Sequence, residues 1–122
     1  MNNLIPVFVL ATLTSTNSLA QDRIDESLLP GEWCYKSTLA NGSSDVKAVN
    51  TNWIFSDNGR VEIQSQWMRD TTSVMPYTYT DGMIEIPKIN KKYEVRELTG
   101  TEMLLINSLG SSENTFLKGK CN

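Results

Sequence analysis

The feature that most constrains the fold is a succession of short segments with alternating side chains, joined by residues that favour tight turns. In the clearest case, residues 52–55 and 61–67 flank Asn58-Gly59, and this pair supplies the positive φ that a hairpin turn requires. Residues 61–67 alternate between a mostly apolar face, which ends at Trp67, and a polar face. Such alternation is typical of a strand with one buried and one solvated face. The sequence therefore predicts an antiparallel hairpin here.

The same pattern recurs along the chain, where turn-forming residues at 81–82 and 99–101 each separate two further candidate strands. Eight strands are predicted, at residues 33–35, 52–55, 61–67, 76–80, 83–86, 93–98, 103–106 and 115–121. We predict an all-β fold, an eight-stranded antiparallel up-and-down barrel, because closing a meander leaves no exposed edge. A sandwich of two open sheets is the alternative. Residues 39–50, which are rich in Asn, Gly and Ser, are predicted to form a loop.

The N-terminal residues predict export. Residues 1–20 carry no charged side chain, are apolar over residues 4–13 and end in Ser18-Leu19-Ala20, a small-x-small pattern that signal peptidase cleaves. We therefore predict a cleaved signal peptide at residues 1–20, a leader segment at 21–30 and one barrel domain at 31–122. The apolar stretch is shorter than the ~20 residues that span a bilayer, so no stable membrane anchor is expected. The protein is predicted to be periplasmic or secreted.

Cys34 and Cys121 are the two cysteines of the chain, and they lie near the two ends of the predicted domain. An even pair in an exported chain predicts a disulfide bond, which would tie the first strand to the last. A redox or metal role is the alternative, but the chain has no C-x-x-C motif and no histidine. No metal ligand and no cofactor are predicted.

Residues 29–35, with the sequence Leu-Pro-Gly-Glu-Trp-Cys-Tyr, mark the entry into the first strand. Pro30 fixes φ and Gly31 frees it, so the chain can bend sharply before Trp33 extends. Trp33 is predicted to plug the core of the barrel, where its N–H needs a hydrogen-bond partner. Trp67, at the end of its predicted strand, is predicted to be a second core residue. Stacking of a ligand on Trp33 is the alternative.

The composition excludes several classes of function. A net charge of −3 argues against nucleic-acid binding, which requires a basic surface. The absence of histidine removes Ser-His-Asp and Cys-His catalysis. A carboxylate pair among Glu62, Glu85 and Glu94 could hydrolyse glycosides, but each of them alternates with apolar residues, as on the solvated face of a strand. The sequence therefore predicts a protein that is not an enzyme and has no catalytic residues.

Several motifs resemble the lipocalin-like, or calycin, group of small secreted β-barrels. They are Gly31-x-Trp33, Trp53-x-Phe55 with its Asp57-Asn58-Gly59 turn, Tyr79-x-Asp81-Gly82, and a cysteine close to the C-terminus. The resemblance implies non-covalent binding of a small apolar ligand, and a basic residue late in the chain, Lys118 or Lys120, that covers Trp33. The candidate ligand-binding residues are the aromatic residues Trp53, Phe55, Tyr77, Tyr79 and Tyr93.

An eight-stranded barrel is only just wide enough for side chains to fill it, so the same aromatic residues could form a packed core. The protein would then be an interaction module for an exported protein partner, such as an inhibitor of an exported hydrolase. A dry interior cavity of roughly 300 Å³ or more would favour the ligand. A filled interior would favour the protein partner.

Overall fold

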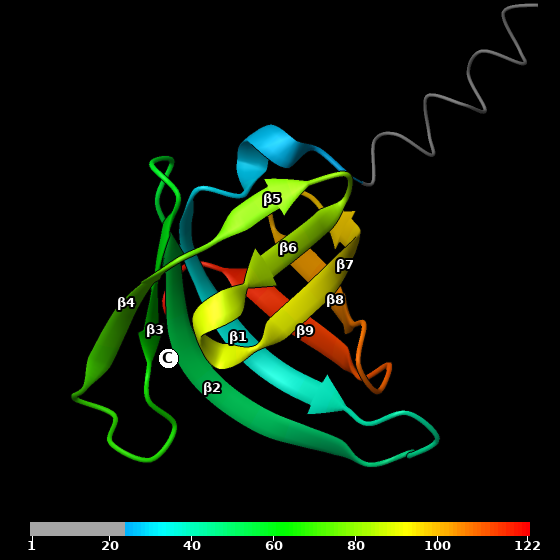
Figure 1. Cartoon of the computed structure of the whole chain (residues 1–122). Coiled ribbons are helices and arrows are strands. Elements are labelled where there is room, and N and C mark those ends of the chain that lie inside the picture. The colour runs from blue at the N-terminus through cyan, green and yellow to red at the C-terminus, as the bar shows by residue number, and fades with distance from the viewer. Residues whose placement is uncertain (1–23) are drawn as a thin grey trace, which may run out of the picture.

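The computed structural model describes residues 24–122 as nine antiparallel strands in one curved sheet, which closes almost completely into a barrel (Figure 1). The strands are β1 (Gly31–Leu39), β2 (Val46–Phe55), β3 (Arg60–Gln64), β4 (Thr72–Pro76), β5 (Thr78–Thr80), β6 (Met83–Ile86), β7 (Lys91–Leu98), β8 (Glu102–Asn107) and β9 (Glu113–Lys118). Two short 3₁₀ helices are η1 (Glu26–Leu28) and η2 (Pro87–Ile89). None of the helices in this part of the chain is long and apolar enough to cross a bilayer. The predicted signal peptide at residues 1–20 lies outside the described residues.

The strands form a meander that closes by pairing the last strand with the first. The order in the sheet is β4-β3-β2-β1-β9-β8-β7-β6-β5, and every neighbouring pair is antiparallel. The sheet has its two edges at β4 and β5, which share no ladder although a single residue, Tyr77, separates them. The helix η2 contacts β4. The predicted all-β up-and-down barrel is confirmed.

The barrel has nine strands and not eight, because the predicted strand at residues 76–80 is divided between two. β4 and β5 meet at Tyr77, whose amide donates to the carbonyl of Gly59 (2.9 Å) instead of to a strand partner. The sequence gives little sign of β4, since Met75 is its one buried side chain and its other four residues are exposed. Without a second buried position, β4 has no alternation to detect.

The loop predicted at residues 39–50 is shorter in the structure, where residues 40–45 alone connect β1 to β2. The prediction is wrong for residues 46–50, which belong to β2. Residues 46–48 are all exposed and therefore show no alternation. A bulge in which Lys36 faces two residues of β2 places Asn50 at φ 55°, a conformation that asparagine tolerates. A bulge bends its strand, and beyond it the β1–β2 hairpin extends past the rest of the sheet (Figure 1).

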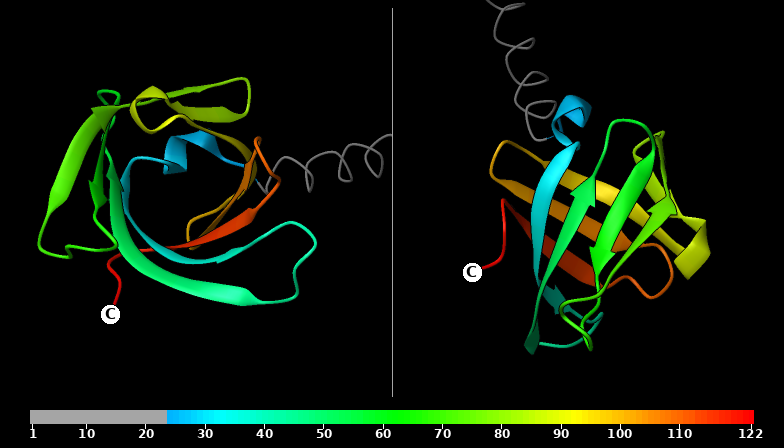
Figure 2. Two further views of the ribbon diagram at one scale, coloured as in Figure 1. Left: turned by 60° about the horizontal axis from the view of Figure 1, so that its bottom comes forward. Right: turned by 90° about the vertical axis from the view of Figure 1, so that its left-hand side faces the viewer.

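The barrel has two ends with different structures (Figure 2). The closed end is covered by η1 and is formed by the turns at residues 56–59, 81–82 and 99–101. The open end is formed by the connections at residues 40–45, 65–71, 87–90 and 108–112. In the left view of Figure 2, which looks along the barrel, η1 lies across the far opening.

The sequence before β1 holds η1 against the closed end. Asp25 caps η1, because its Oδ1 accepts a hydrogen bond from the amide of Ser27 (3.1 Å). The Asp25 amide in turn donates to the carbonyl of Leu98 at the end of β7 (3.0 Å). These bonds place Leu29 in the core with 2% of its surface exposed.

Trp33 lies beneath η1 and is completely buried. Its indole Nε1 donates to the carbonyl of Leu29 (2.9 Å), so the polar atom of this large side chain is satisfied. The Lys118 ammonium lies 4.6 Å from the centroid of the Trp33 ring and 3.3 Å from the carbonyl of Pro30. Lys118 therefore covers Trp33, as the resemblance implied for Lys118 or Lys120.

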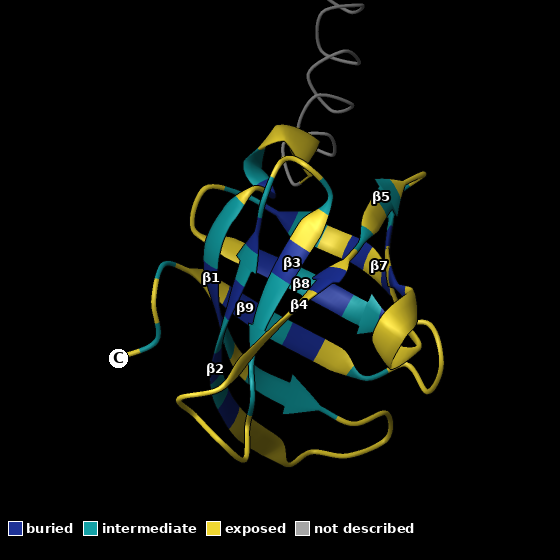
Figure 3. Ribbon diagram, turned by 60° about the vertical axis from the view of Figure 1, so that its left-hand side comes forward, coloured by how far each residue is buried: buried dark blue, intermediate teal, exposed yellow. Residues whose placement is uncertain are grey.

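The core is one cluster of buried side chains that runs through the barrel (Figure 3). Trp53 lies at its centre, and its ring centroid is 5.1 Å from that of Phe116, 5.5 Å from Tyr35, 6.0 Å from Phe55 and 6.3 Å from Tyr93. Aromatic rings at these separations are in direct contact. At the level of Trp53 the interior is therefore filled by side chains.

The prediction that Trp67 is a core residue is wrong. Trp67 is 90% exposed, because β3 ends at Gln64 and the chain turns before it reaches the indole. The Ser65 hydroxyl accepts hydrogen bonds from the amides of Trp67 (3.2 Å) and Met68 (3.1 Å), and this turn directs the chain away from the sheet. Trp67 thus lies in the 65–71 connection at the open end.

Cys34 and Cys121 form the predicted disulfide, with their Cα atoms 4.9 Å apart. The bond joins β1 to the segment that follows β9. The amide of Cys121 also donates to Oδ1 of Asn52 on β2 (2.7 Å). The C-terminal segment is therefore attached to both of the first two strands.

Candidate binding site at the open end

The five aromatic residues predicted to bind a ligand all belong to the core cluster or pack against it. Trp53, Phe55 and Tyr93 are buried, with exposed fractions of 4%, 1% and 4%. Tyr77 and Tyr79 are partly buried, and the Tyr77 hydroxyl donates to the carbonyl of Ser56 (2.8 Å). The structure therefore brings these residues together as the packing of the interior.

The tyrosines of this cluster lie in surroundings that favour the neutral phenol. Burial is the main cause that raises the pKa of Tyr93, and the neighbouring Tyr35 adds to it. Burial, and then the charge of Glu26, raises the pKa of Tyr79 to about 12. Among the described residues the buried Tyr79 hydroxyl has no hydrogen-bond partner. The interior is thus apolar even where it contains phenol groups.

A polar layer lies between the core and the open end on the wall formed by β1, β8 and β9. Asn114 is 3% exposed, and its Oδ1 accepts hydrogen bonds from the Tyr35 hydroxyl and from Thr38 Oγ1 (2.9 Å for Thr38). Its Nδ2 donates to the carbonyls of Leu105 (3.1 Å) and Ser112 (3.2 Å). All of these groups are satisfied by one another, and they form a stable floor beneath this side of the open end.

Above this floor lies a hollow of about 360 Å³ between the β1–β2 hairpin and the 65–71 connection. It is lined by Thr38, Lys47, Ala48, Val49, Gln66 and Trp67. Thr38 and Lys47 are paired across β1 and β2, so their side chains share a face. The Thr38 hydroxyl donates to Asn114 in the polar layer, so the face that Thr38 and Lys47 share is the one directed toward the inside of the barrel.

Gln64 positions the 65–71 connection beside the hollow. Its Oε1 accepts a hydrogen bond from the amide of Asn52 on β2 (2.9 Å), and its Nε2 donates to the carbonyl of Arg69 (2.6 Å). Arg69 Nη2 in turn lies 3.5 Å from the carbonyl of Val49. These contacts tie both ends of the connection to β2, which leaves the indole of Trp67 exposed at the edge of the hollow.

The chemistry of the hollow is amphiphilic. Trp67 and Val49 offer apolar surface, and Lys47 offers a cation. Thr38 and Gln66 add hydrogen-bonding groups. Such a set of groups suits a small molecule that has an apolar body and a polar or anionic end.

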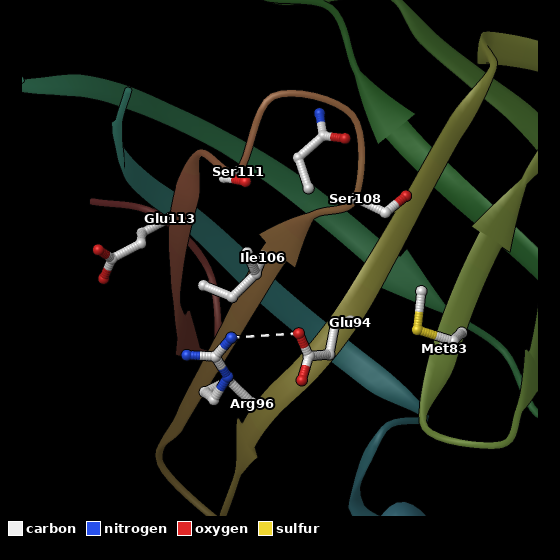
Figure 4. A pocket seen from close by; sticks show the side chains of 8 residues that line it. Met83, Glu94, Arg96, Ile106, Ser108, Ser111 and Glu113 are labelled. Atoms are coloured by element: carbon white, nitrogen blue, oxygen red, sulfur yellow. Dashed lines mark hydrogen bonds and ion pairs between the residues drawn. The ribbon is translucent and has the colours of Figure 1, made fainter. Parts of the chain in front are cut away.

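A second hollow, of about 470 Å³, lies on the outer wall of β6 to β9 (Figure 4). Its charged side chains include Glu94 and Arg96, which form an ion pair at 3.1 Å with both side chains about half exposed. Ile106 and Met83 are the apolar residues in its lining. This hollow is a surface depression with charged walls, and Asn107 is the buried residue in its lining.

The carboxylates considered for catalysis do not form one cluster. Glu85 and Glu94 lie on neighbouring strands of the outer wall, where Glu85 is paired with Lys92 and Glu94 with Met83 across β6 and β7. Glu62 is on β3, paired with Val74 of β4 on the other side of the barrel. Within residues 24–122, no group of three or more His, Cys, Asp or Glu side chains could hold a metal ion.

Sequence reasoning did not identify the residues of the open-end hollow. Trp67 was assigned to the core, and Thr38, Lys47 and Gln66 were not singled out. The available signal was Ser65, because a serine whose hydroxyl can bond the amides that follow it favours a turn over a strand. A turn at Ser65 would have placed Trp67 outside the sheet.

A nearly closed antiparallel meander, with a buried tryptophan under a short N-terminal helix and a cation over its ring, is consistent with a lipocalin-like barrel. Two solved structures are similar to it. One is a lipocalin-like protein from Bacteroides uniformis ATCC 8492, with a TM-score of 0.64 and 16% sequence identity, covering 75% of this chain and 99% of that one. The other is an uncharacterized protein from Bacteroides eggerthii DSM 20697, with a TM-score of 0.57, 16% identity and coverage of 75% and 99%. No protein-family model and no curated protein sequence matches the chain. At this identity the likeness establishes the lipocalin-like fold.

Proposed function

We propose that this protein is an exported, non-catalytic binding protein that holds a small amphiphilic ligand in the hollow at the open end of its barrel. Export is supported by the disulfide between Cys34 and Cys121 and by the signal-like sequence of residues 1–20. Binding is supported by the lipocalin-like fold. The ligand would be mostly apolar, with a polar or anionic group at one end.

The observation that carries the proposal is the hollow between Trp67 and the β1–β2 hairpin. Its volume of about 360 Å³ lies within the range of sites that take small molecules. The exposed indole offers a large rigid surface to the apolar part of a ligand, at a low cost in side-chain entropy. The ammonium of Lys47 would face its anionic end.

A panel of fatty acids, sterols and haem, titrated against tryptophan fluorescence, tests the proposal. We expect a saturable change for at least one amphiphile, and an affinity that falls about tenfold in Trp67→Ala but little in Trp67→Phe, which keeps a ring. Lys47→Gln should weaken a carboxylate more than the matching alcohol. Lys120→Gln, the same change outside the hollow, is the control. A flat response across the panel would contradict the proposal.

A second candidate function is an interaction module for an exported protein, such as an inhibitor of an exported hydrolase. The filled interior favours it, because the aromatic cluster around Trp53 leaves the walls and connections as the surfaces available to a partner. The outer-wall hollow beside Arg96 and Ile106 is the first surface to mutate (Figure 4). Recovery of one specific protein from the exported fraction, lost in Arg96→Glu and retained in Trp67→Ala, would support this function.

A further inference from the structure

The exposed apolar residues of this protein gather at one end of the barrel. Eight large apolar side chains are exposed in the described part of the chain, and five of them lie on or beside the connections of the open end. These five are Val46 (64% exposed), Trp67 (90%), Met68 (58%), Ile89 (38%) and Leu109 (67%). They come from four separate connections, so no single loop accounts for the clustering.

The charges of the described residues are divided in the same way. Residues 38–47, 63–73, 85–92 and 106–114, which are the connections of the open end with the two nearest residues of each adjoining strand, contain five basic and four acidic side chains. The remaining described residues contain five basic and nine acidic side chains. The basic residues of the open end are Lys47, Arg69, Lys88, Lys91 and Lys92. The open end therefore has a small excess of basic residues in a protein of net negative charge, and it carries five of the eight exposed apolar side chains.

We propose that the open end docks reversibly on the surface of a bilayer that contains anionic lipid. Trp67 and Met68 would enter the headgroup region, where tryptophan side chains concentrate at membrane surfaces. The five basic residues would face the lipid phosphates. The rest of the described protein, which is acidic, would be repelled by the same surface, so the charge distribution also favours this orientation of the barrel.

The arrangement favours a membrane over a protein partner. The four connections that carry the apolar residues surround the opening of the barrel (Figure 2). A broad, deformable surface can contact all four connections at once, whereas a compact partner would leave some of them uncovered. Apolar insertion and electrostatic attraction are each weak, and together they give reversible attachment. This docking does not depend on whether the hollow holds a ligand.

Vesicle binding tests the proposal, with the same full chain in every variant. We expect binding to phosphatidylcholine vesicles that contain about a third phosphatidylglycerol, weak binding to pure phosphatidylcholine, and loss of binding at high salt. The triple variant K88Q/K91Q/K92Q should bind about tenfold more weakly or worse. The matched control R60Q/R96Q/K120Q removes the same charge outside the open end and should bind at least as well as the parent chain. All six positions are exposed, so the unfolding midpoints should agree.

The fluorescence of Trp67 reports whether its indole contacts lipid, because the other two tryptophans, Trp33 and Trp53, are buried. Lipids brominated near the headgroup should quench the fluorescence of the parent chain, and this quenching should disappear in Trp67→Phe. Absence of quenching, equal binding to neutral vesicles, or an equal loss in both triple variants would overturn the proposal. Capture of a protein by the open end without any vesicle binding would overturn it as well.

Discussion

The three tryptophans of this chain occupy three environments that determine three different roles. Trp33 is buried at the closed end with its N–H bonded, Trp53 is the centre of the aromatic core, and Trp67 is exposed at the open end. The sequence correctly indicated Trp33, because the Pro30-Gly31 bend places it at the start of a strand. The prediction for Trp67 is wrong, because alternation along residues 61–67 assigns it to the core, whereas β3 ends at Gln64 and Trp67 is exposed.

Alanine substitutions should separate Trp33 from Trp67. We expect Trp33→Ala to lower the free energy of unfolding by about 3 kcal/mol, since it leaves a cavity under η1. Trp67→Ala should change it by less than about 0.5 kcal/mol, since the indole packs against little. Urea unfolding of both variants measures this. A large loss for Trp67→Ala would place its ring in the core after all.

Substitution of phenylalanine for Tyr77 and for Tyr79 gives a matched pair of variants. Tyr77→Phe removes the hydrogen bond to the Ser56 carbonyl and should lower the free energy of unfolding by about 1 kcal/mol. Tyr79→Phe removes a buried hydroxyl that has no partner in the described part of the chain, and should be neutral or stabilising. Equal losses in both variants would indicate that the Tyr79 hydroxyl is bonded in solution.

At the scale of elements, turn residues were better predictors than strand residues. Asn58-Gly59 and Asp81-Gly82 located two hairpins correctly, because the positive φ that glycine allows is a local requirement. β4 and the first part of β2 do not stand out in the sequence, because few of their residues are buried. Their strand structure comes from pairing with β3 and β1, and such long-range pairing leaves no local pattern in the sequence.

The disulfide is the covalent connection between β1 and the C-terminal segment. Its sequence separation of 87 residues gives a stabilisation of up to about 4.6 kcal/mol in the chain-entropy model. We expect the double variant with Cys34→Ala and Cys121→Ala to lose a large part of this free energy of unfolding while it keeps the vesicle binding described above. Urea unfolding with and without reductant checks the first point. An unchanged midpoint in reductant would show that the bond does not stabilise the fold.

At the scale of the whole molecule, the buried tyrosines make stability depend on alkaline pH. Burial raises the pKa values of Tyr35, Tyr77, Tyr79 and Tyr93 in the folded protein, to about 12 for Tyr79. Since the unfolded pKa is near 10, this contribution is complete below about pH 10 and is lost as the pH rises toward the folded values. Urea midpoints should therefore fall between about pH 10 and pH 12. Tyr79→Phe should reduce the fall, and a constant midpoint would contradict the burial of these phenols.

The central claim for the whole molecule is that the barrel interior is packed and that binding takes place at the open end. The three indole N–H groups test it in one experiment, because a proton–nitrogen correlation spectrum gives each tryptophan its own signal. Dodecanoate, added to the protein, should shift the Trp67 signal and leave the signals of Trp33 and Trp53 in place. A shift of the Trp53 signal with Trp67 unchanged would show that the ligand enters the core, and would contradict the account.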